Sequence, residues 1–300
     1  MRYLSAWSPN KHTSWDNNQR AATYRSSLFL NDKHGHRALH RSDRPTRTNR
    51  MTTKNTIKTV QSLKQQKYRR QHGLFVVEGR KMVDELMRSS FDIEMLFATE
   101  KYLDMHDTNM ACETVSATQM EQMSGQDTEP GILAVVRIPE DRPFVAQPTD
   151  TTLALDNIGN PGNMGTIIRT ADWFGVKNIV CSENCVEAWN PKVVQATMGS
   201  LFRVNIYKTD LCAFMQQHSG IMSYGAFLEG ENIFSDTLDY RGGIIVIGSE
   251  SHGISEEVGR LIGTPINIPK PHASDTESLN ASIATAIILS ELYRKQNLRH

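Results

Sequence analysis

The sequence predicts an α/β protein, in which a small α/β domain precedes a larger domain built on a parallel sheet with helices on both faces. Two observations support this fold class. First, short apolar strands alternate with helical segments from Leu153 onward, a pattern typical of a parallel sheet covered by helices. Second, three of the expected strands run into polar, glycine-containing loops, at 156–169, 247–255 and 268–282. Because parallel strands end at one edge of their sheet, we expect these loops to meet there and form a site.

The larger domain is expected to span 153–300. Its last helix, over 281–296, is long and apolar on one face, and a shorter helix is expected over 255–262. The expected strands of this domain are 153–156, 178–182, 202–207, 223–228, 243–248 and 265–269.

The smaller domain is expected to span 54–139, followed by a linker over 140–152 that is rich in proline. A basic amphipathic helix over 54–70 opens the domain, and a second helix over 80–88 follows its first strand. The inward residues of these helices are Ile57, Val60, Leu63 and Tyr68 in the first and Met82, Val83, Leu86 and Met87 in the second. The expected strands are 75–79, 95–99 and 132–138.

Residues 1–50 are expected to form a disordered basic tail, because they contain many polar residues and few periodic apolar ones. A mitochondrial presequence is a rival interpretation, but Asp16, Asp32 and Asp43 and the lack of an amphipathic helix argue against it. A third interpretation, which we favour, is that translation begins at Met51.

The charge of the chain is unevenly distributed. Residues 1–81 contain 18 Lys and Arg against 4 Asp and Glu, whereas the remaining residues contain 15 against 29. A basic first part suggests an anionic partner, with nucleic acid the leading candidate. A solvated basic tail without a partner explains the charge equally well.

Four cysteines form no disulfide framework in a chain of 300 residues. Cys181 and Cys185 are spaced as Cys-x₃-Cys, but no second pair of ligands lies nearby, so we expect no metal site. The sequence contains neither an apolar run long enough for a membrane span nor a signal-peptide core. We therefore expect a cytoplasmic protein that does not enter the membrane.

The first loop has the sequence DNIGNPGNMGTIIR and opens a helix. Its glycines are spaced Gly-x-x-Gly-x-x-Gly, which is not the dinucleotide-binding pattern. Asn163 is expected to cap the helix. Arg169 shares the outward face of that helix with Thr166 and Asp172. On its own, this loop is explained as a helix cap followed by a surface arginine.

The second and third loops also carry polar side chains at the ends of apolar strands. Glu250 follows the strand at 243–248 and can accept hydrogen bonds from loop amides or a ligand. His252 is a base by residue type, although a lone histidine in a loop is usually solvated. In the third loop, Ser278 is expected to cap the final helix, and Asn280 offers an amide for hydrogen bonding.

The three loops, taken in order, resemble the three motifs of the SpoU (TrmH) family of RNA ribose 2′-O-methyltransferases. The residues that match the polar positions of the motifs are Asn163, Arg169, Glu250, Ser278 and Asn280. The resemblance implies that these residues are catalytic and that the larger domain is a trefoil-knotted parallel sheet that binds S-adenosylmethionine. By position, the residues implied to contact this cofactor are Gly248, Ile268, Leu279 and Leu228.

The resemblance also implies an RNA substrate, either tRNA or rRNA, and a homodimer. Family members often carry a small RNA-binding domain, which the run at 78–87 resembles. The basic residues expected to contact RNA are Lys64, Lys67, Arg69, Arg70 and Arg80. Arg169 is either the base or the residue that binds the RNA phosphate. The third motif departs from the common pattern, because Ile-Pro-Lys at 268–270 precedes a longer loop.

Two other functions compete with methyl transfer. The chain could be an RNA-binding protein that has lost catalysis, which the complete set of motif residues argues against. It could also be a nicotinamide-dependent oxidoreductase, which the glycine spacing disfavours.

Overall fold

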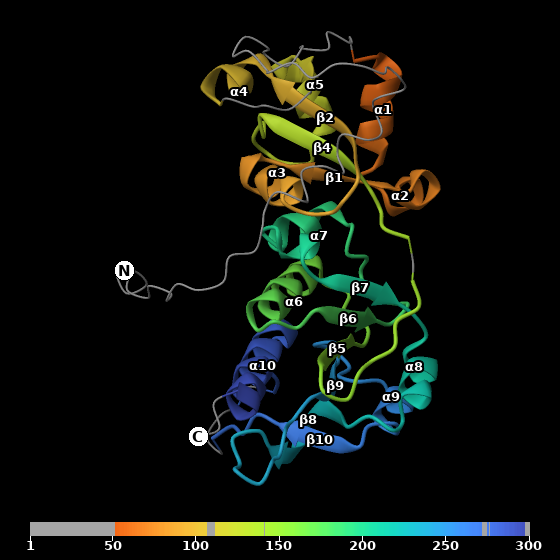
Figure 1. Ribbon diagram of the computed structural model, residues 1–300, viewed down its shortest axis with the longest axis vertical. Helices are drawn as coiled ribbons and strands as arrows, with labels where there is room; N and C mark the ends of the chain where they lie inside the picture. The colour runs from red at the N-terminus through yellow and green to blue at the C-terminus, as the bar shows by residue number, and fades with distance from the viewer. Residues whose placement is uncertain (1–51, 107–111, 141, 272–274, 276, 298–300) are drawn as a thin grey trace, which may run out of the picture. The chain divides into compact units, whose positions relative to one another are not determined.

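The structure is a computed structural model that describes residues 52–106, 112–140, 142–271, 275 and 277–297. The tail expected at 1–50 and the start expected at Met51 lie outside the described residues. Within them the chain forms two sheets, one in each of the expected regions (Figure 1).

The first sheet belongs to the smaller domain and has the strand order β1-β4-β2-β3. Strand β4 runs antiparallel to β1 and β2, and β3 runs parallel to β2. The three expected strands are confirmed, whereas β3 was not expected. The elements are α1 (Lys54–Ser62), α2 (Gln66–His72), β1 (Leu74–Glu78), α3 (Arg80–Met87), β2 (Ile93–Thr99), α4 (Glu100–Met105), β3 (Glu113–Val115), α5 (Ala117–Met123) and β4 (Ile132–Arg137).

The single helix expected over 54–70 is wrong, because the chain forms two helices there. Helix α1 ends at Ser62, and Gln65 has an extended backbone before α2 begins. The break allows Arg69 to fold back, so that its Nη1 donates hydrogen bonds to the carbonyl oxygens of Leu63 and Lys64 at 2.8 and 2.9 Å. In α3, Met82, Val83 and Leu86 are buried as expected, but Met87 is exposed.

The second sheet belongs to the larger domain and has the order β10-β8-β9-β5-β6-β7, with every neighbouring pair parallel. The strand expected at 202–207 begins later, because residues 200–202 form a buried 3₁₀ turn, η2. The strands are β5 (Thr151–Leu155), β6 (Asn178–Cys181), β7 (Asn205–Lys208), β8 (Ser223–Asn232), β9 (Gly243–Ile247) and β10 (Thr264–Asn267). The helices are α6 (Pro161–Trp173), α7 (Pro191–Ala196), α8 (Leu211–Gln217), α9 (Glu256–Gly259) and α10 (Ala281–Asn297).

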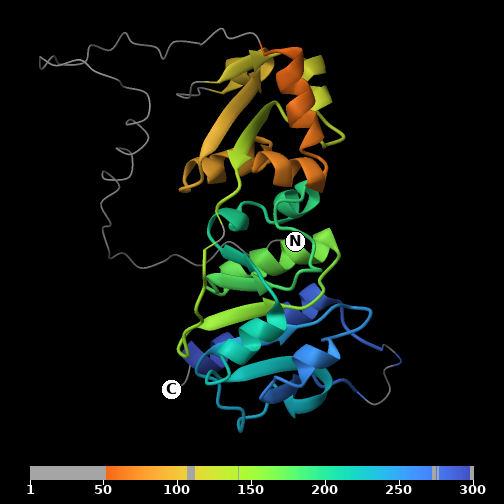
Figure 2. The ribbon, with the colours of Figure 1, turned by 90° about the vertical axis from the view of Figure 1, so that its right-hand side faces the viewer.

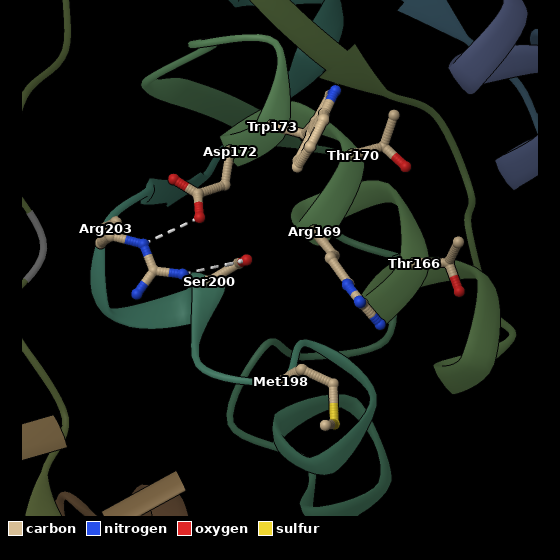
Figure 3. A pocket seen from close by; sticks show the side chains of 8 residues that line it. All are labelled: Thr166, Arg169, Thr170, Asp172, Trp173, Met198, Ser200 and Arg203. Carbon is tan, nitrogen blue, oxygen red and sulfur yellow. Dashed lines mark hydrogen bonds and ion pairs between the residues drawn. The ribbon is translucent and has the colours of Figure 1, made fainter. Parts of the chain in front are cut away.

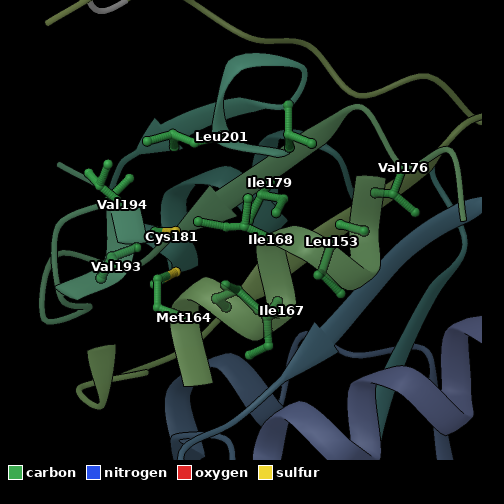
Figure 4. Packing of buried hydrophobic residues seen from close by; sticks show 14 of the residues in the cluster. Leu153, Met164, Ile167, Ile168, Val176, Ile179, Cys181, Val193, Val194 and Leu201 are labelled. Carbon is green, nitrogen blue, oxygen red and sulfur yellow. The ribbon is translucent and has the colours of Figure 1, made fainter. Parts of the chain in front are cut away.

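Helices cover both faces of this sheet, as the fold class predicts. Successive side chains of a strand point to opposite faces, and in β5 Leu153 and Leu155 join one core while Ala154 joins the other. Helices α6 and α10 pack on the first face, shown in part in Figure 4, and α8 and α9 pack on the second, which faces the viewer in Figure 2. No helix among the described residues is long and apolar enough to cross a membrane.

The close approach of α6 to α7 depends on Gly165. A methyl group at this position would lie 2.4 Å from Ala196 Cβ and 3.0 Å from the carbonyl oxygen of Val193. Glycine is therefore the residue that lets the helix carrying Arg169 pack in its observed place.

We predict that Gly165→Ala lowers the free energy of unfolding by about 1–3 kcal/mol, the usual cost of overpacking a core. Urea denaturation measures this loss. Gly159→Ala is the matched control, because a methyl group there meets nothing within 4 Å. Equal stability of the two variants would contradict the packing role of Gly165.

Candidate active site

The three polar loops lie at the carboxyl ends of β5, β9 and β10. Strands β5 and β9 are neighbours in the sheet, so the first two loops start side by side. The chain that follows β10 reaches the same place, because Asn280 contacts residues of both other loops. The structure therefore brings together three segments that are far apart in the sequence.

Glu250 is the residue on which these segments converge. Its Oε1 accepts a hydrogen bond of 2.7 Å from Asn163 Nδ2, a second from Asn280 Nδ2, and one of 3.3 Å from the backbone N–H of Ala281. Asn280 Nδ2 also donates to Asn163 Oδ1 at 3.0 Å. Hydrogen bonds to a carboxylate are generally stronger than bonds between neutral groups. The three side chains thus form one closed network.

Asp156 fixes the first loop from beneath, a role that the sequence argument missed. This buried carboxylate accepts hydrogen bonds from Asn157 Nδ2 at 2.9 Å and from the backbone N–H of Ser255 at 2.7 Å. It therefore joins the end of β5 to the segment after the second loop. The sequence did carry a signal for this role, because Asp156 is an acidic residue that directly follows an apolar strand.

Gly248 is required by the shape of the second loop. Ser249 and Gly253 exchange two backbone hydrogen bonds of 3.0 and 2.9 Å, which close the loop into a tight ring. A Cβ atom on Gly248 would lie 2.1 Å from the carbonyl carbon of Gly253. A side chain at this position is incompatible with the ring that presents Glu250.

Two expected helix caps are wrong. Asn160, not Asn163, caps α6, because its Oδ1 accepts from the N–H groups of Gly162 and Asn163. Asn160 precedes Pro161, which occupies the first helical position, and Asn163 is thereby free to contact Glu250.

Ser278 does not cap α10, since Asn280 Oδ1 accepts from the N–H groups of Ser282 and Ile283. Ser278 is exposed and forms no hydrogen bond with the described residues.

Arg169 lies on the outward face of α6, in a groove of about 480 Å³ (Figure 3). Its guanidinium forms no hydrogen bond or ion pair with another described residue. Asp172, in the same groove, is instead bonded to Arg203 Nε at 2.8 Å. The groove is lined by Thr166, Arg169, Thr170, Asp172, Trp173, Met198, Ser200 and Arg203, of which only Thr166, Arg169 and Asp172 were singled out from the sequence.

The residues expected to bind the cofactor lie within β8 (Leu228), directly after β9 and β10 (Gly248 and Ile268) or in the loop before α10 (Leu279). Ile268 is partly buried against the core, whereas Leu228 and Leu279 are exposed apolar side chains. Asn267 Nδ2 donates to the carbonyl oxygen of Leu228 at 3.4 Å, which ties β10 to β8. Its Oδ1 is buried and has no hydrogen-bond partner among the described residues. An unused acceptor beside exposed apolar side chains fits a ligand that has both amino and apolar groups.

The basic residues expected to contact RNA lie in the smaller domain, but not all of them are available. Arg69 is 2% exposed and its Nε forms an ion pair with Glu187 of the larger domain, so its expected role at the surface is wrong. Lys67 and Arg70 are exposed on α2. Lys64 Nζ donates to the carbonyl oxygen of Ser124, and Arg80 lies 3.6 Å from Asp84.

Cys181 and Cys185 have a structural role beneath the first loop. Cys185 Sγ accepts a hydrogen bond of 3.3 Å from the N–H of Ile158. A hydrogen bond with Cys181 lowers the pKa of Cys185 to about 7, and the same bond, together with burial, raises the pKa of Cys181. Within the ranges that the structure describes, no three histidine, cysteine or acidic side chains are grouped as metal ligands.

Both domains match known proteins. Residues 150–290 match the SpoU rRNA Methylase family, and residues 54–134 match the MRM3-like substrate binding domain. The 23S rRNA (guanosine(2553)-2'-O)-methyltransferase RlmP of Bacillus subtilis is 25% identical over 240 residues, which are 79% of this chain and 95% of that protein.

Two solved structures are similar over almost their whole length. A putative RNA methyltransferase of the TrmH family from Porphyromonas gingivalis has 37% sequence identity and a TM-score of 0.73, over 82% of this chain and 99% of that chain. An AdoMet-bound rRNA methyltransferase from Sinorhizobium meliloti has 26% identity and a TM-score of 0.72, over 83% and 98%. The chain belongs to the SpoU family of S-adenosylmethionine-dependent RNA methyltransferases.

We predict that Glu250→Ala weakens binding of S-adenosylmethionine and lowers the free energy of unfolding by about 1 kcal/mol, because three donors lose their shared acceptor. Glu250→Gln keeps one acceptor oxygen, so it should reduce both cofactor binding and the free energy of unfolding by less than Glu250→Ala does. Isothermal titration and urea denaturation measure the two effects. Glu256→Ala, which removes an exposed acidic residue of α9, is the control. If Glu250→Ala binds S-adenosylmethionine with unchanged affinity, the network does not support the cofactor site.

Proposed function

We propose that the protein transfers a methyl group from S-adenosylmethionine to a ribose 2′-hydroxyl of ribosomal RNA. The observation that carries this proposal is the network of Asn163, Glu250 and Asn280 at the carboxyl ends of parallel strands, with Arg169 six residues after Asn163 on α6. The family gives the class of reaction, and the network supports a working rather than a degenerate site. Loss of any one of the three side chains would remove two of the three hydrogen bonds that join them.

The site acts mainly by positioning its two substrates. S-adenosylmethionine, when bound, supplies an electrophilic methyl group, and Gly248, Ile268, Leu279 and Leu228 are the residues that would hold it. The unused Oδ1 of Asn267 can accept a hydrogen bond from an amino group there. Aligning a hydroxyl with a methyl group lowers the barrier without a strong base.

Arg169 is proposed to bind the RNA beside the reacting hydroxyl. An arginine side chain stays protonated in proteins, so it is suited to hold a phosphate or to stabilise negative charge developing on the 2′-oxygen. The proton of the hydroxyl then leaves to the RNA phosphate or to water. Ser278, exposed before α10, is proposed to orient the ribose.

Ribosomal RNA is the proposed substrate because RlmP and the Sinorhizobium protein are named for it and the smaller domain matches a substrate binding domain. Lys67 and Arg70, exposed on α2, are proposed to contact its phosphates, and Lys64 and Arg80 are further candidates. Transfer RNA is the alternative that site mapping would reveal.

The larger domain is proposed to contain the trefoil knot of its family. Strand β10 forms the edge of the sheet, yet the chain after it returns past β8 and β9 and places Asn280 against Asn163. Helix α10 then packs on α6. A returning segment of this kind is what a knot requires.

A homodimer is also proposed, with α6 and α10 contributing its interface. Trp173 on α6 is 84% exposed, and Ile283 and Tyr293 on α10 are half exposed. Large apolar side chains grouped at the surface favour a protein partner, and a second copy would cover them. A cytoplasmic location remains a prediction, supported by cysteines that form no disulfide within the described residues.

We predict that Arg169→Ala abolishes methyl transfer to RNA while binding of S-adenosylmethionine stays nearly unchanged. Transfer of a radioactive methyl group to rRNA, with mapping of 2′-O-methyl sites, measures the first, and calorimetry measures the second. Arg169→Lys should recover little activity, because an ammonium cannot bind two oxygens as a guanidinium does. Full activity of Arg169→Ala would refute the proposed site.

We predict that Ile283→Glu converts the dimer into a monomer, since a carboxylate on an apolar interface is costly to bury. Sedimentation velocity gives the mass directly. Met222→Glu is the control, because Met222 is 59% exposed and lies outside α6 and α10. The proposed interface would be contradicted if the wild-type protein were a monomer, or if the Ile283→Glu variant still formed a dimer.

A further inference from the structure

Arg203 bonds to three elements of the structure at once. Its Nε donates to Asp172 on α6 at 2.8 Å, its Nη1 donates to Glu85 on α3, and its Nη2 donates to Ser200 Oγ on η2 at 3.4 Å. Burial acts to lower the pKa of Arg203, but its hydrogen bonds to Asp172 and Glu85 raise that pKa overall. The guanidinium therefore remains charged between two carboxylates.

Asp172 is the partner that matters for the site. It lies three residues after Arg169 on α6, and side chains at this spacing are neighbours on a helix surface. Both residues line the same groove. Without Arg203, the carboxylate of Asp172 would have the guanidinium of Arg169 as its nearest available cation among the groove residues.

Figure 3 shows that the observed arrangement avoids this pairing. The carboxylate of Asp172 is directed at Arg203, and the side chain of Arg169 points away from it. An Arg169 paired with Asp172 would have to break that ion pair before it could bind a phosphate. An unpaired Asp172 would also repel the phosphate.

We propose that Arg203 is a positioning residue, which holds Asp172 away from Arg169 and so leaves Arg169 free to bind RNA. This inference rests on the proposed function. Arg203 touches neither substrate in this role. It acts on RNA binding through the charge of Asp172 alone.

The bond to Glu85 connects this arrangement to the smaller domain. Gly199, whose φ is +95°, lies against the stem of Glu85, and a Cβ there would be 2.6 Å from Glu85 Cγ. Glu85 is thereby fixed beside Arg203. The orientation of Arg203 is thus set from both domains, while its effect on Arg169 passes through Asp172.

The experiment is a double-mutant cycle on steady-state methyl transfer to rRNA. Arg203→Met should lower kcat/KM for RNA about tenfold, mostly by raising KM, because Asp172 then competes for Arg169. In the Asp172→Asn background, the same substitution should change kcat/KM less than about twofold, since no carboxylate remains to compete. Arg241→Met, which breaks an exposed ion pair with Asp239, is the matched control for replacing an arginine.

Calorimetric titration with S-adenosylmethionine and thermal melting establish that each variant is folded, and Arg203→Gln replaces Arg203→Met if the latter is not. The proposal would be overturned if Arg203→Met lowered kcat/KM equally in the wild-type and the Asp172→Asn backgrounds. It would also be overturned if Glu85→Gln alone lowered kcat/KM as much as Arg203→Met does. The first result would mean that Arg203 acts independently of Asp172. The second would mean that Arg203 serves only to join the two domains. Wild-type protein without methyl transfer would refute the proposed function instead.

Discussion

The carboxylate of Glu250 is the interaction on which the site depends. It collects donors from α6 and from the start of α10, two helices that are far apart in the sequence. No apolar contact could set these positions so closely, because a hydrogen bond specifies both direction and distance. The ring closed by Ser249 and Gly253 holds the carboxylate in place, and Gly248 makes that ring sterically possible.

Much of the fold and part of the site could be predicted from local patterns. Alternating strands and helices gave the parallel sheet, and polar loops after β5 and β9 indicated that Asn163 and Glu250 would lie close together. The cap of α6 was mistaken because asparagine occurs at both 160 and 163, and only the place of Pro161 distinguishes them. The buried Arg69 has its ion-pair partner in Glu187, 118 residues away, which no local pattern reveals.

The two domains share packing as well as ion pairs. Phe75 of β1 lies 4.9 Å from the ring of Trp189, and Phe91 lies 5.3 Å from that of Phe202. Arg69 and Arg203 add charged contacts at separate points of the same boundary. Apolar rings and ion pairs thus both contribute to the contacts between the two domains.

The return of the chain from β10 to α6 has a consequence for synthesis of the protein. Asn163 and Glu250 leave the ribosome before Asn280 and α10, yet the network that joins them needs all three residues. A nascent chain that stops before Asn280 contains the strands of both sheets but lacks the third member of the network. The hydrogen bonds that join the three loops can therefore form only after the segment that opens the last helix has been synthesised.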